Sequence, residues 1–483
     1  MYVLRYHTQR ANFYEKLYIC RTVDKFYTNF NVIAKYSTSF TKVQLEYALR
    51  KLILKNPVLA MNFFRDVPNK KSDRELGGSN FYKKPLDKIK ANDVLFILKE
   101  EQPIDNEFLK SLNDIEFHID AQKPLWCLQV YNYNGHQYLV YLTDHVMVDG
   151  TCGTAFHEDL LHELVNLDDN LLPLNTIFNY TKDKLALCPL PPTSDKFGST
   201  MKPPIFFAAK IVLQTYVLSK RANKWFHRLA DRKYPDTDKY PIFNYKPAYL
   251  QEETFFSMSN ISPTDVATIL RFLRSKNLTM TPYLTAIATQ TMQQYIFPLV
   301  SKQTYSSIID IAVNGRSFYP QHKSDLRYSF FVSIVEPVLG QLKLDRRFSS
   351  IQEETEYISK SIHKGVDEGK AFWYLGMLRY INSWKFVHKY IGRTDARSTI
   401  NVSNLGNVSI NEGGIVVEDL IFSQDLGLSS HIGLSTVSTP TGGLNIVFNY
   451  FHYINDLEFE GKLAIDIFTQ EFTKRIVEYA DPD

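Results

Sequence analysis

The stretch LVYLTDHVMVDGTCGTAF, residues 139–156, decides the fold of the region around it. Its apolar start is rich in residues that favour β-strands, and after Gly150 apolar residues recur at helical spacing. We therefore predict a strand, a short loop and a helix, with His145 in the loop where the strand has just ended. An imidazole at the end of a rigid strand can be aimed into a cleft, as a general base requires.

The spacing HxxxDG allows two interpretations of this loop. Histidine has a reference pKa of about 6.5, so it can accept a proton near neutral pH. Asp149 can fix the loop by pairing with an arginine or with backbone amides, and Gly150 permits an unusual backbone angle or a close approach. A histidine at the end of a strand is nevertheless structural more often than catalytic, so the string alone leaves both roles open.

The flanking segments predict a mixed α/β fold. TKVQLEYALRKLILKNPVL, from Thr41, has its apolar residues on one helical face and should stop as a helix at Pro57. Two β-rich runs around Asn134 and Gly135 predict an antiparallel hairpin with a type I′ turn. In the second half we expect helices that start near Ser262 or Thr264 and near Thr281 with Pro282, and strands in SSIIDIAVNGRSFYP, YSFFVSIVEPV, GGIVVEDLIFS and GGLNIVFNYF.

Residues 183–204 are rich in Pro, Ser and Thr, which is typical of a linker. They divide the chain into a first half, 1–182, and a second half, 205–483. Across both halves 55 basic residues nearly balance 52 acidic ones, and the net charge of +3 disfavours a dedicated nucleic-acid binder. We expect the four separated cysteines to be reduced thiols, and the charged N-terminus MYVLRYHTQR predicts no secretory signal.

An apolar helix is expected after residue 204, but Lys210 and Gln214 interrupt it within the roughly 20 residues that a bilayer crossing needs. Basic residues mixed with Trp225 and Phe226 follow it, so this segment can either lie flat on an anionic membrane or pack on the protein. We expect a monomer in the cytoplasm; if the segment lies on a membrane, the surface would be that of the endoplasmic reticulum or of lipid droplets.

No metal site is predicted. His157 and His162 in HEDLLHE lie five residues apart rather than four, which turns them to different helix faces and spoils zinc binding. Cys152 lies near His145 and has the chemistry of a nucleophile, but its place at a helix start favours a packing role. No P-loop or GxGxxG pattern follows a strand.

Five stretches, LRKLILKNPVL, KPLWCLQVY, HVMVDG, VNGRSFYP and INVSNLGNV, occur in an order that resembles the CoA-dependent acyltransferase superfamily. This superfamily includes plant BAHD acyltransferases, chloramphenicol acetyltransferase and peptide-synthetase condensation domains, and the fungal alcohol acetyltransferases are the closest likeness. The chain lacks the plant DFGWG motif. Asp144 stands where condensation domains usually have a second histidine, which argues against a carrier-protein substrate.

The resemblance implies an α/β fold of two chloramphenicol-acetyltransferase-like halves, with mixed, mostly antiparallel sheets flanked by helices and an active-site tunnel between them. It implies an acetyltransferase in which His145 deprotonates the hydroxyl or amine of a small hydrophobic acceptor, such as an alcohol, a sterol or a sphingoid-like amino alcohol. The acceptor would then attack acetyl-CoA directly. Acetyl-CoA is thus the expected co-substrate, with no tightly bound cofactor.

The resemblance also assigns supporting residues. Asp149 should point away from the chemistry and order the loop, with Arg316 as its partner. An oxyanion donor is expected. The candidate donors are Ser403, Asn404, Ser435, Thr436, Ser438 and Thr439, and the candidates for binding CoA phosphates are Arg393 and Arg397. Surface hydroxyls and a solvated loop are the alternative interpretations of these two sets.

Two rival functions remain open on the sequence. One is a non-catalytic protein that binds lipophilic ligands and keeps the acyltransferase fold. The other is a peripheral membrane adaptor that uses the helix from Ile205.

Overall fold

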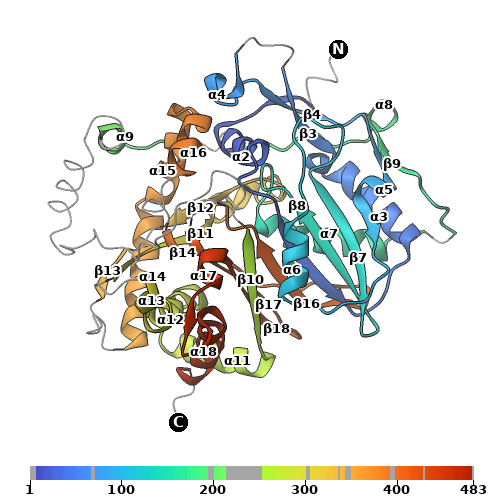
Figure 1. Cartoon of the computed structure of the whole chain (residues 1–483). Helices are drawn as coiled ribbons and strands as arrows, with labels where there is room; N and C mark the ends of the chain where they lie inside the picture. Colours follow the sequence, from blue (N-terminus) through green and yellow to red (C-terminus); the bar gives the residue numbers. More distant parts are fainter. Residues whose placement is uncertain are drawn as a thin grey trace.

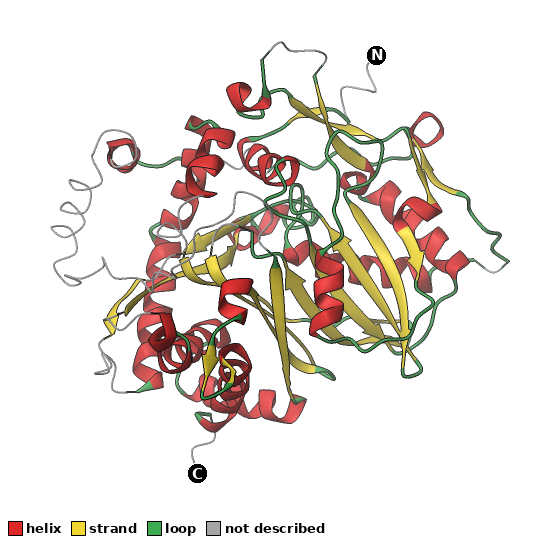
Figure 2. Ribbon diagram, in the orientation of Figure 1, coloured by secondary structure: helices red, strands yellow, loops and turns green. Residues whose placement is uncertain are grey.

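The computed structural model describes residues 7–66, 71–168, 170–193, 201–213, 253–300, 305–335, 338–342, 350–391, 398–427 and 430–480. Two larger sheets are flanked by helices (Figures 1 and 2). Most neighbouring strands are antiparallel, and the parallel pairs are β6 with β7, β11 with β14, and β14 with β17. The predicted α/β class with mixed, mostly antiparallel sheets is therefore confirmed.

The first sheet has the strand order β15-β16-β2-β8-β7-β6. Its β7–β8 hairpin turns at Asn134 and Gly135, whose φ angles of 49° and 75° confirm the predicted type I′ turn. The strands are β2 (Phe30–Tyr36), β6 (Leu95–Ile97), β7 (Trp126–Tyr133), β8 (His136–Thr143), β15 (Asn411–Glu412) and β16 (Ile415–Gln424).

Two helices, α3 (Lys42–Lys55) and α7 (Gly150–Val165), pack on each other, and α7 contacts β2. Thr41 caps α3 with its side chain, and the helix ends before Pro57 as predicted. The α7 helix starts at Gly150, so His145 lies between the end of β8 and the start of α7, also as predicted.

The first sheet includes strands from both sides of the predicted division of the chain. β16 belongs by sequence to the second half, 205–483, yet it pairs with β2 from Gln424 opposite Phe30 to Val417 opposite Tyr36. It covers the edge that β2 would otherwise expose. The boundary at residues 183–204 stays a prediction about the chain's connectivity, because the first sheet is completed by a strand from beyond it.

The second sheet has the order β10-β18-β17-β14-β11-β12, with β13 paired to β11. Ser262 caps α11 by accepting a hydrogen bond from the Asp265 amide, as predicted. The next helix, α12, begins at Met280, one residue before the predicted Thr281. The strands are β10 (Thr254–Ile261), β11 (Tyr305–Asn314), β12 (Val332–Val335), β13 (Val338–Leu342), β14 (Ser398–Asn407), β17 (Ser430–Thr439) and β18 (Gly443–Phe451), and the principal helices are α11 (Pro263–Ser275), α12 (Met280–Tyr295), α14 (Ile351–Asp367) and α18 (Ala464–Glu478).

Smaller elements complete the fold. Among them, α2 packs on α16 and borders the cavity that contains His145. They are β1 (Gln9–Arg10), α2 (Phe13–Val23), η1 (Pro57–Ala60), β3 (Met61–Arg65), α4 (Asp73–Leu76), β4 (Phe81–Pro85), β5 (Lys88–Lys90), α5 (Ala91–Val94), α6 (Asn106–Asn113), β9 (Thr176–Asn179), α8 (Tyr180–Asp183), α9 (Ile205–Val212), α13 (Phe297–Val300), η4 (Gly315–Phe318), η5 (Pro320–His322), α15 (Lys370–Met377), η6 (Leu378–Tyr380), α16 (Ser383–Ile391), α17 (His452–Asn455), β19 (Glu458–Phe459) and β20 (Lys462–Leu463).

The segment predicted to contact a membrane is described only in part. Ile205 and Phe206 of α9 are 83% and 90% exposed, and the basic residues that follow, with Trp225 and Phe226, lie outside the described residues. Among the helices that are described, none is long and apolar enough to span a bilayer. Peripheral membrane contact stays a prediction.

A close approach of α7 to β2 depends on Gly153. A Cβ atom at this position would lie 2.5 Å from Cγ2 of Val32. Alanine favours a helix over glycine by about 1 kcal/mol, but the overlap should dominate, so we expect Gly153→Ala to lower the free energy of unfolding by about 1–3 kcal/mol. Urea unfolding measures this change.

The control is the double variant Gly153→Ala with Val32→Ala, which removes the opposing methyl groups. It should lose less stability than the sum of the two single variants, since the residues are in contact. Additive losses would show that the overlap is relieved in another way.

Candidate active site

His145 is oriented by its own loop. Its Nδ1 lies 2.6 Å from the Val148 carbonyl oxygen. Because a carbonyl can only accept a hydrogen bond, Nδ1 carries the ring proton and donates a hydrogen bond to it. Nε2 therefore holds a free lone pair. Asp144 anchors the same loop because its carboxylate accepts hydrogen bonds of 2.7 Å from the Val146 amide and of 2.7 Å from the Thr22 hydroxyl.

Four aromatic rings surround the imidazole. The ring centroids of Tyr18, Phe30 and Phe330 lie 5.0 Å from that of His145, and the Tyr27 centroid lies 5.8 Å away. This burial lowers the pKa of His145 to about 4, although the nearby Asp149 carboxylate and the Val148 carbonyl act in the opposite direction. The imidazole is therefore neutral at physiological pH and can accept a proton.

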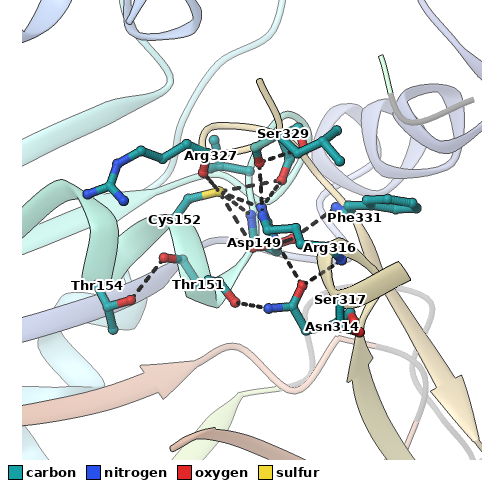
Figure 3. A network of polar contacts seen from close by, with 12 residues as sticks. Asp149, Thr151, Cys152, Thr154, Asn314, Arg316, Ser317, Arg327, Ser329 and Phe331 are labelled. Atoms are coloured by element: carbon teal, nitrogen blue, oxygen red, sulfur yellow. Dashed lines mark hydrogen bonds and ion pairs between the residues drawn. The ribbon is translucent and has the colours of Figure 1, made fainter. Parts of the chain in front are cut away.

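Asp149 and Arg316 form a buried ion pair between the start of α7 and η4 (Figure 3). Oδ2 of Asp149 accepts hydrogen bonds of 2.9 Å from Nη1 of Arg316 and of 2.9 Å from the Phe331 amide. Arg316 also donates to the carbonyl oxygens of Leu326 at 2.8 Å and Ser329 at 2.6 Å. Burial alone would raise the pKa of Asp149, but the Arg316 charge and these hydrogen bonds hold it below its usual value.

Gly150 and Cys152 have packing roles in this region. A Cβ atom at Gly150 would lie 2.9 Å from Cδ2 of Leu405, so the glycine permits a close approach. Cys152 is fully buried beside the ion pair, and its Sγ accepts a hydrogen bond from Nη2 of Arg316 at 3.3 Å (Figure 3). Burial raises the pKa of the thiol to about 12, so Cys152 is a packed thiol rather than a nucleophile.

The two histidines of α7 lie in different surroundings. His157 is buried, with Nε2 3.0 Å from the Val32 carbonyl oxygen and Nδ1 3.1 Å from the Tyr36 hydroxyl. His162 is exposed and lies 2.8 Å from Glu412. They cannot share a zinc ion, as the five-residue spacing predicted.

A cavity of about 920 Å³, including its opening to solvent, contains the partly exposed imidazole of His145. The first half contributes α2 and the His145 loop to its wall, and the second half contributes parts of β11, β14, β17 and β18. Both halves therefore meet at the histidine. The active-site tunnel between the halves stays a prediction.

Two of the six predicted oxyanion donors line the cavity. Ser403 and Asn404 of β14 line it, whereas Ser435, Thr436, Ser438 and Thr439 of β17 are not among its lining residues. Ser435 instead accepts a hydrogen bond from Gln424 at 3.1 Å. Arg393 and Arg397, the candidates for binding CoA, lie outside the described residues.

Sequence reasoning missed helix α2, and with it Tyr18 and Arg21, which line the cavity three residues apart on that helix. A signal was present. Asn12 and Glu15 form a capping box, a pattern that marks the start of a helix before an apolar run.

The chain is similar to known acetyltransferases over nearly its whole length. The alcohol acetyltransferase family model matches residues 10–472. Alcohol O-acetyltransferase 1 of Saccharomyces cerevisiae is 22% identical over 499 residues, covering 91% of this chain and 90% of the relative. N-acetyltransferase SLI1 of the same yeast is 22% identical over 444 residues, covering 85% of this chain and 88% of the relative.

Solved structures share the fold. Trichothecene 15-O-acetyltransferase TRI3 from Fusarium sporotrichioides has a TM-score of 0.66 at 10% identity, over 98% of this chain and 95% of that one. The first condensation domain of the CDA synthetase has a TM-score of 0.60 at 13% identity, over 99% and 97% of the two chains.

Breaking the buried ion pair should destabilise the protein strongly. Arg316→Ala leaves the Asp149 carboxylate buried without its counter-charge, and we expect a loss of about 3–5 kcal/mol in the free energy of unfolding. The matched control is Arg327→Ala, because Arg327 pairs with Asp159 and Glu158 at a partly exposed site where water can solvate the carboxylates once the guanidinium is lost, so its loss should be smaller. Equal losses in urea unfolding would contradict the assigned role of the buried pair.

Proposed function

This chain belongs to the alcohol acetyltransferase family and is an acyltransferase, and we propose that it transfers an acetyl group from acetyl-CoA to the hydroxyl or amine of a hydrophobic acceptor, with His145 as general base. Membership in an acetyltransferase family implies acetyl-CoA as the co-substrate. The observation that carries the catalytic proposal is the unprotonated Nε2 of a partly exposed imidazole beside the cavity.

In the proposed reaction the acceptor donates its O–H or N–H to Nε2 of His145. As the proton moves to Nε2, the acceptor atom attacks the thioester carbonyl carbon. The tetrahedral intermediate then collapses, the C–S bond breaks, and the proton passes from the imidazolium to the departing CoA sulfur. No covalent bond to the protein forms.

The surroundings of His145 support each part of this step. The Val148 carbonyl accepts a hydrogen bond from Nδ1–H, which holds the ring in the required tautomer and stabilises the imidazolium once it forms. Asp149 faces Arg316 and acts by ordering the loop. The negative charge that develops on the thioester oxygen calls for a hydrogen-bond donor, and Ser403 and Asn404 are the predicted donors that line the cavity.

A hydrophobic acceptor is favoured by the aromatic side chains around the base. Tyr18 and Tyr27 line the cavity beside His145, and the buried rings of Phe30 and Phe330 pack against the imidazole. These residues also limit the access of water, which would otherwise compete with the acceptor for the thioester. The rival function, a binding protein without chemistry, predicts acceptor binding with no release of CoA.

Replacing the base should abolish most of the turnover. His145→Ala should lower kcat for acetyl transfer by about 10²–10⁴-fold, the usual contribution of a positioned general base. The assay measures thiol release from acetyl-CoA with a medium-chain alcohol or amine. His162→Ala is the matched control, because His162 is an exposed histidine on the neighbouring helix and should leave turnover unchanged. Unchanged turnover in His145→Ala would remove the histidine from the base role.

The low pKa of His145 predicts activity at acidic pH. Below its pKa the imidazole is protonated and cannot act as a base. Since that pKa is about 4, kcat/KM should stay near its maximum at pH 5.5, where a histidine of ordinary pKa would have lost about nine-tenths of its neutral form.

Asp144 titrates in the same range, because burial raises its pKa to about 6. The profile is therefore measured for the wild type and for Asp144→Asn, with circular dichroism as the check on folding. A fall in kcat/KM near pH 6.5 that persists in Asp144→Asn would contradict the lowered pKa of His145.

A further inference from the structure

Three side chains with metal-ligating atoms meet where α2 packs on α16, outside the residues that line the His145 cavity. Sγ of Cys20, a carboxylate oxygen of Asp24 and a ring nitrogen of His388 all lie within 4.8 Å of one another. Nε2 of His388 lies 2.7 Å from Oδ2 of Asp24, and Sγ of Cys20 lies 3.8 Å from the same oxygen. Within the described ranges, no other group of His, Cys, Asp and Glu brings three such atoms this close. We call these three residues the α2–α16 cluster.

Helix geometry and helix packing place the three residues together. Cys20 and Asp24 are four residues apart at the end of α2, which turns both side chains to one face of the helix. His388 lies on α16, 364 residues beyond Asp24, and its ring packs edge-on against Phe26 at a centroid distance of 5.4 Å. Sequence spacing alone therefore does not reveal the cluster.

The cluster has one buried ligand and one open side. Cys20 is 0% exposed, whereas the side chains of Asp24 and His388 are 27% and 28% exposed. An ion can therefore enter from solvent, and solvent can supply a further ligand to it.

The separations of the ligand atoms suit a small transition-metal ion. Zinc lies about 2.0–2.3 Å from its nitrogen, oxygen and sulfur ligands, so two ligands at tetrahedral corners lie roughly 3–4 Å apart. The two separations of 2.7 Å and 3.8 Å, with the limit of 4.8 Å for the whole group, bracket this range. The ion would replace the hydrogen bond between His388 and Asp24, and moving these two atoms apart by less than about 1 Å makes room for it.

The order of contacts argues against a cysteine nucleophile. In a nucleophilic site the imidazole contacts the thiol, and a carboxylate orients the imidazole from behind. Here Oδ2 of Asp24 is the central atom, since it contacts both the thiol and the imidazole. Burial and the charge of Asp24 raise the pKa of the Cys20 thiol, so it stays protonated until a cation displaces the proton.

The chemistry of the ligands selects zinc. Magnesium and calcium take oxygen ligands, whereas a thiolate with an imidazole and a carboxylate suits zinc. The Cys20 thiolate and the Asp24 carboxylate carry two negative charges, which a dication balances, and a neutral imidazole adds none. The loaded cluster is therefore neutral overall, which lowers the cost of burying its charges.

We infer that the α2–α16 cluster binds a zinc ion through Cys20, Asp24 and His388, with solvent as the fourth ligand. The ion would fasten α2 to α16. Tyr18 and Arg21 of α2 line the catalytic cavity, whereas none of the three ligands does, so the ion acts on the position of this wall and does not contact the substrates. The inference stands apart from the proposed function.

The test measures metal binding by the full chain after a chelator has removed bound metal. The wild type dialysed against zinc should hold about one zinc ion per chain by elemental analysis, and cobalt in its place should give the near-ultraviolet absorption of a cobalt–thiolate bond. Zinc should also raise the midpoint of thermal unfolding. Cys20→Ser should lose the cobalt–thiolate absorption. His388→Gln should weaken zinc binding by at least about 10–100-fold, the cost of losing even a residue that only hydrogen-bonds to a zinc ligand.

Cys188→Ser and His162→Gln are the matched controls. Cys188 is an exposed free thiol, and His162 pairs with Glu412 at 2.8 Å without belonging to a group of three ligands. Both variants should bind zinc as the wild type does. Circular dichroism checks the fold of each variant, and His388→Gln, which changes a partly exposed side chain, decides the test if Cys20→Ser does not fold.

Four results would overturn the inference. A wild type that retains almost no zinc after dialysis has no site, and cobalt binding without thiolate absorption would exclude Cys20 as a ligand. Full zinc affinity in folded His388→Gln would place the ion elsewhere, as would loss of zinc from either control. Because the readout is metal binding rather than turnover, a failure of acetyl transfer would count against the proposed function alone.

Discussion

The buried ion pair between Asp149 and Arg316 is the constraint on which the site depends. It joins the start of α7 to η4. The hydrogen bond from the Phe331 amide to Asp149 also connects the residue before β12 to the same carboxylate. A buried pair of this kind stabilises little compared with well-packed apolar residues, but losing one partner is costly. Its effect is therefore to specify one arrangement of two segments that are far apart in the sequence (Figure 3). Residues from both segments line the cavity.

The chemistry of His145 follows from this arrangement through two further features. The loop that Asp149 closes carries the Val148 carbonyl, which fixes the proton on Nδ1 and leaves Nε2 free. Packing against aromatic rings lowers the pKa of the imidazole and keeps it neutral, and two of these rings, Tyr18 and Tyr27, line the cavity. In the proposed function, one set of side chains thus sets the protonation state of the base and favours an apolar acceptor.

Local patterns predicted much of this structure, and long-range pairing limited the rest. The Asn134–Gly135 turn, the helix before Pro57 and the strand-loop-helix around His145 were predictable because turn chemistry and periodicity act over a few residues. The insertion of β16 beside β2 was not, because nothing local in either strand specifies a partner several hundred residues away. The resemblance implies Ser435 and Thr436 as candidate oxyanion donors, yet Ser430 and Gly433 of the same strand line the cavity. β17 is buried along its whole length, so its pattern does not show which residues face the cavity.

The central claim is that acceptor and acetyl donor meet at Nε2 of His145. A crystal structure with CoA and an unreactive acceptor analogue tests it most directly. The account predicts the acceptor oxygen or nitrogen within about 2.6–3.2 Å of Nε2, with the CoA sulfur on the far side of the reacting atom. An acceptor bound away from the imidazole, or an Nε2 that is closed off from both ligands, would contradict it.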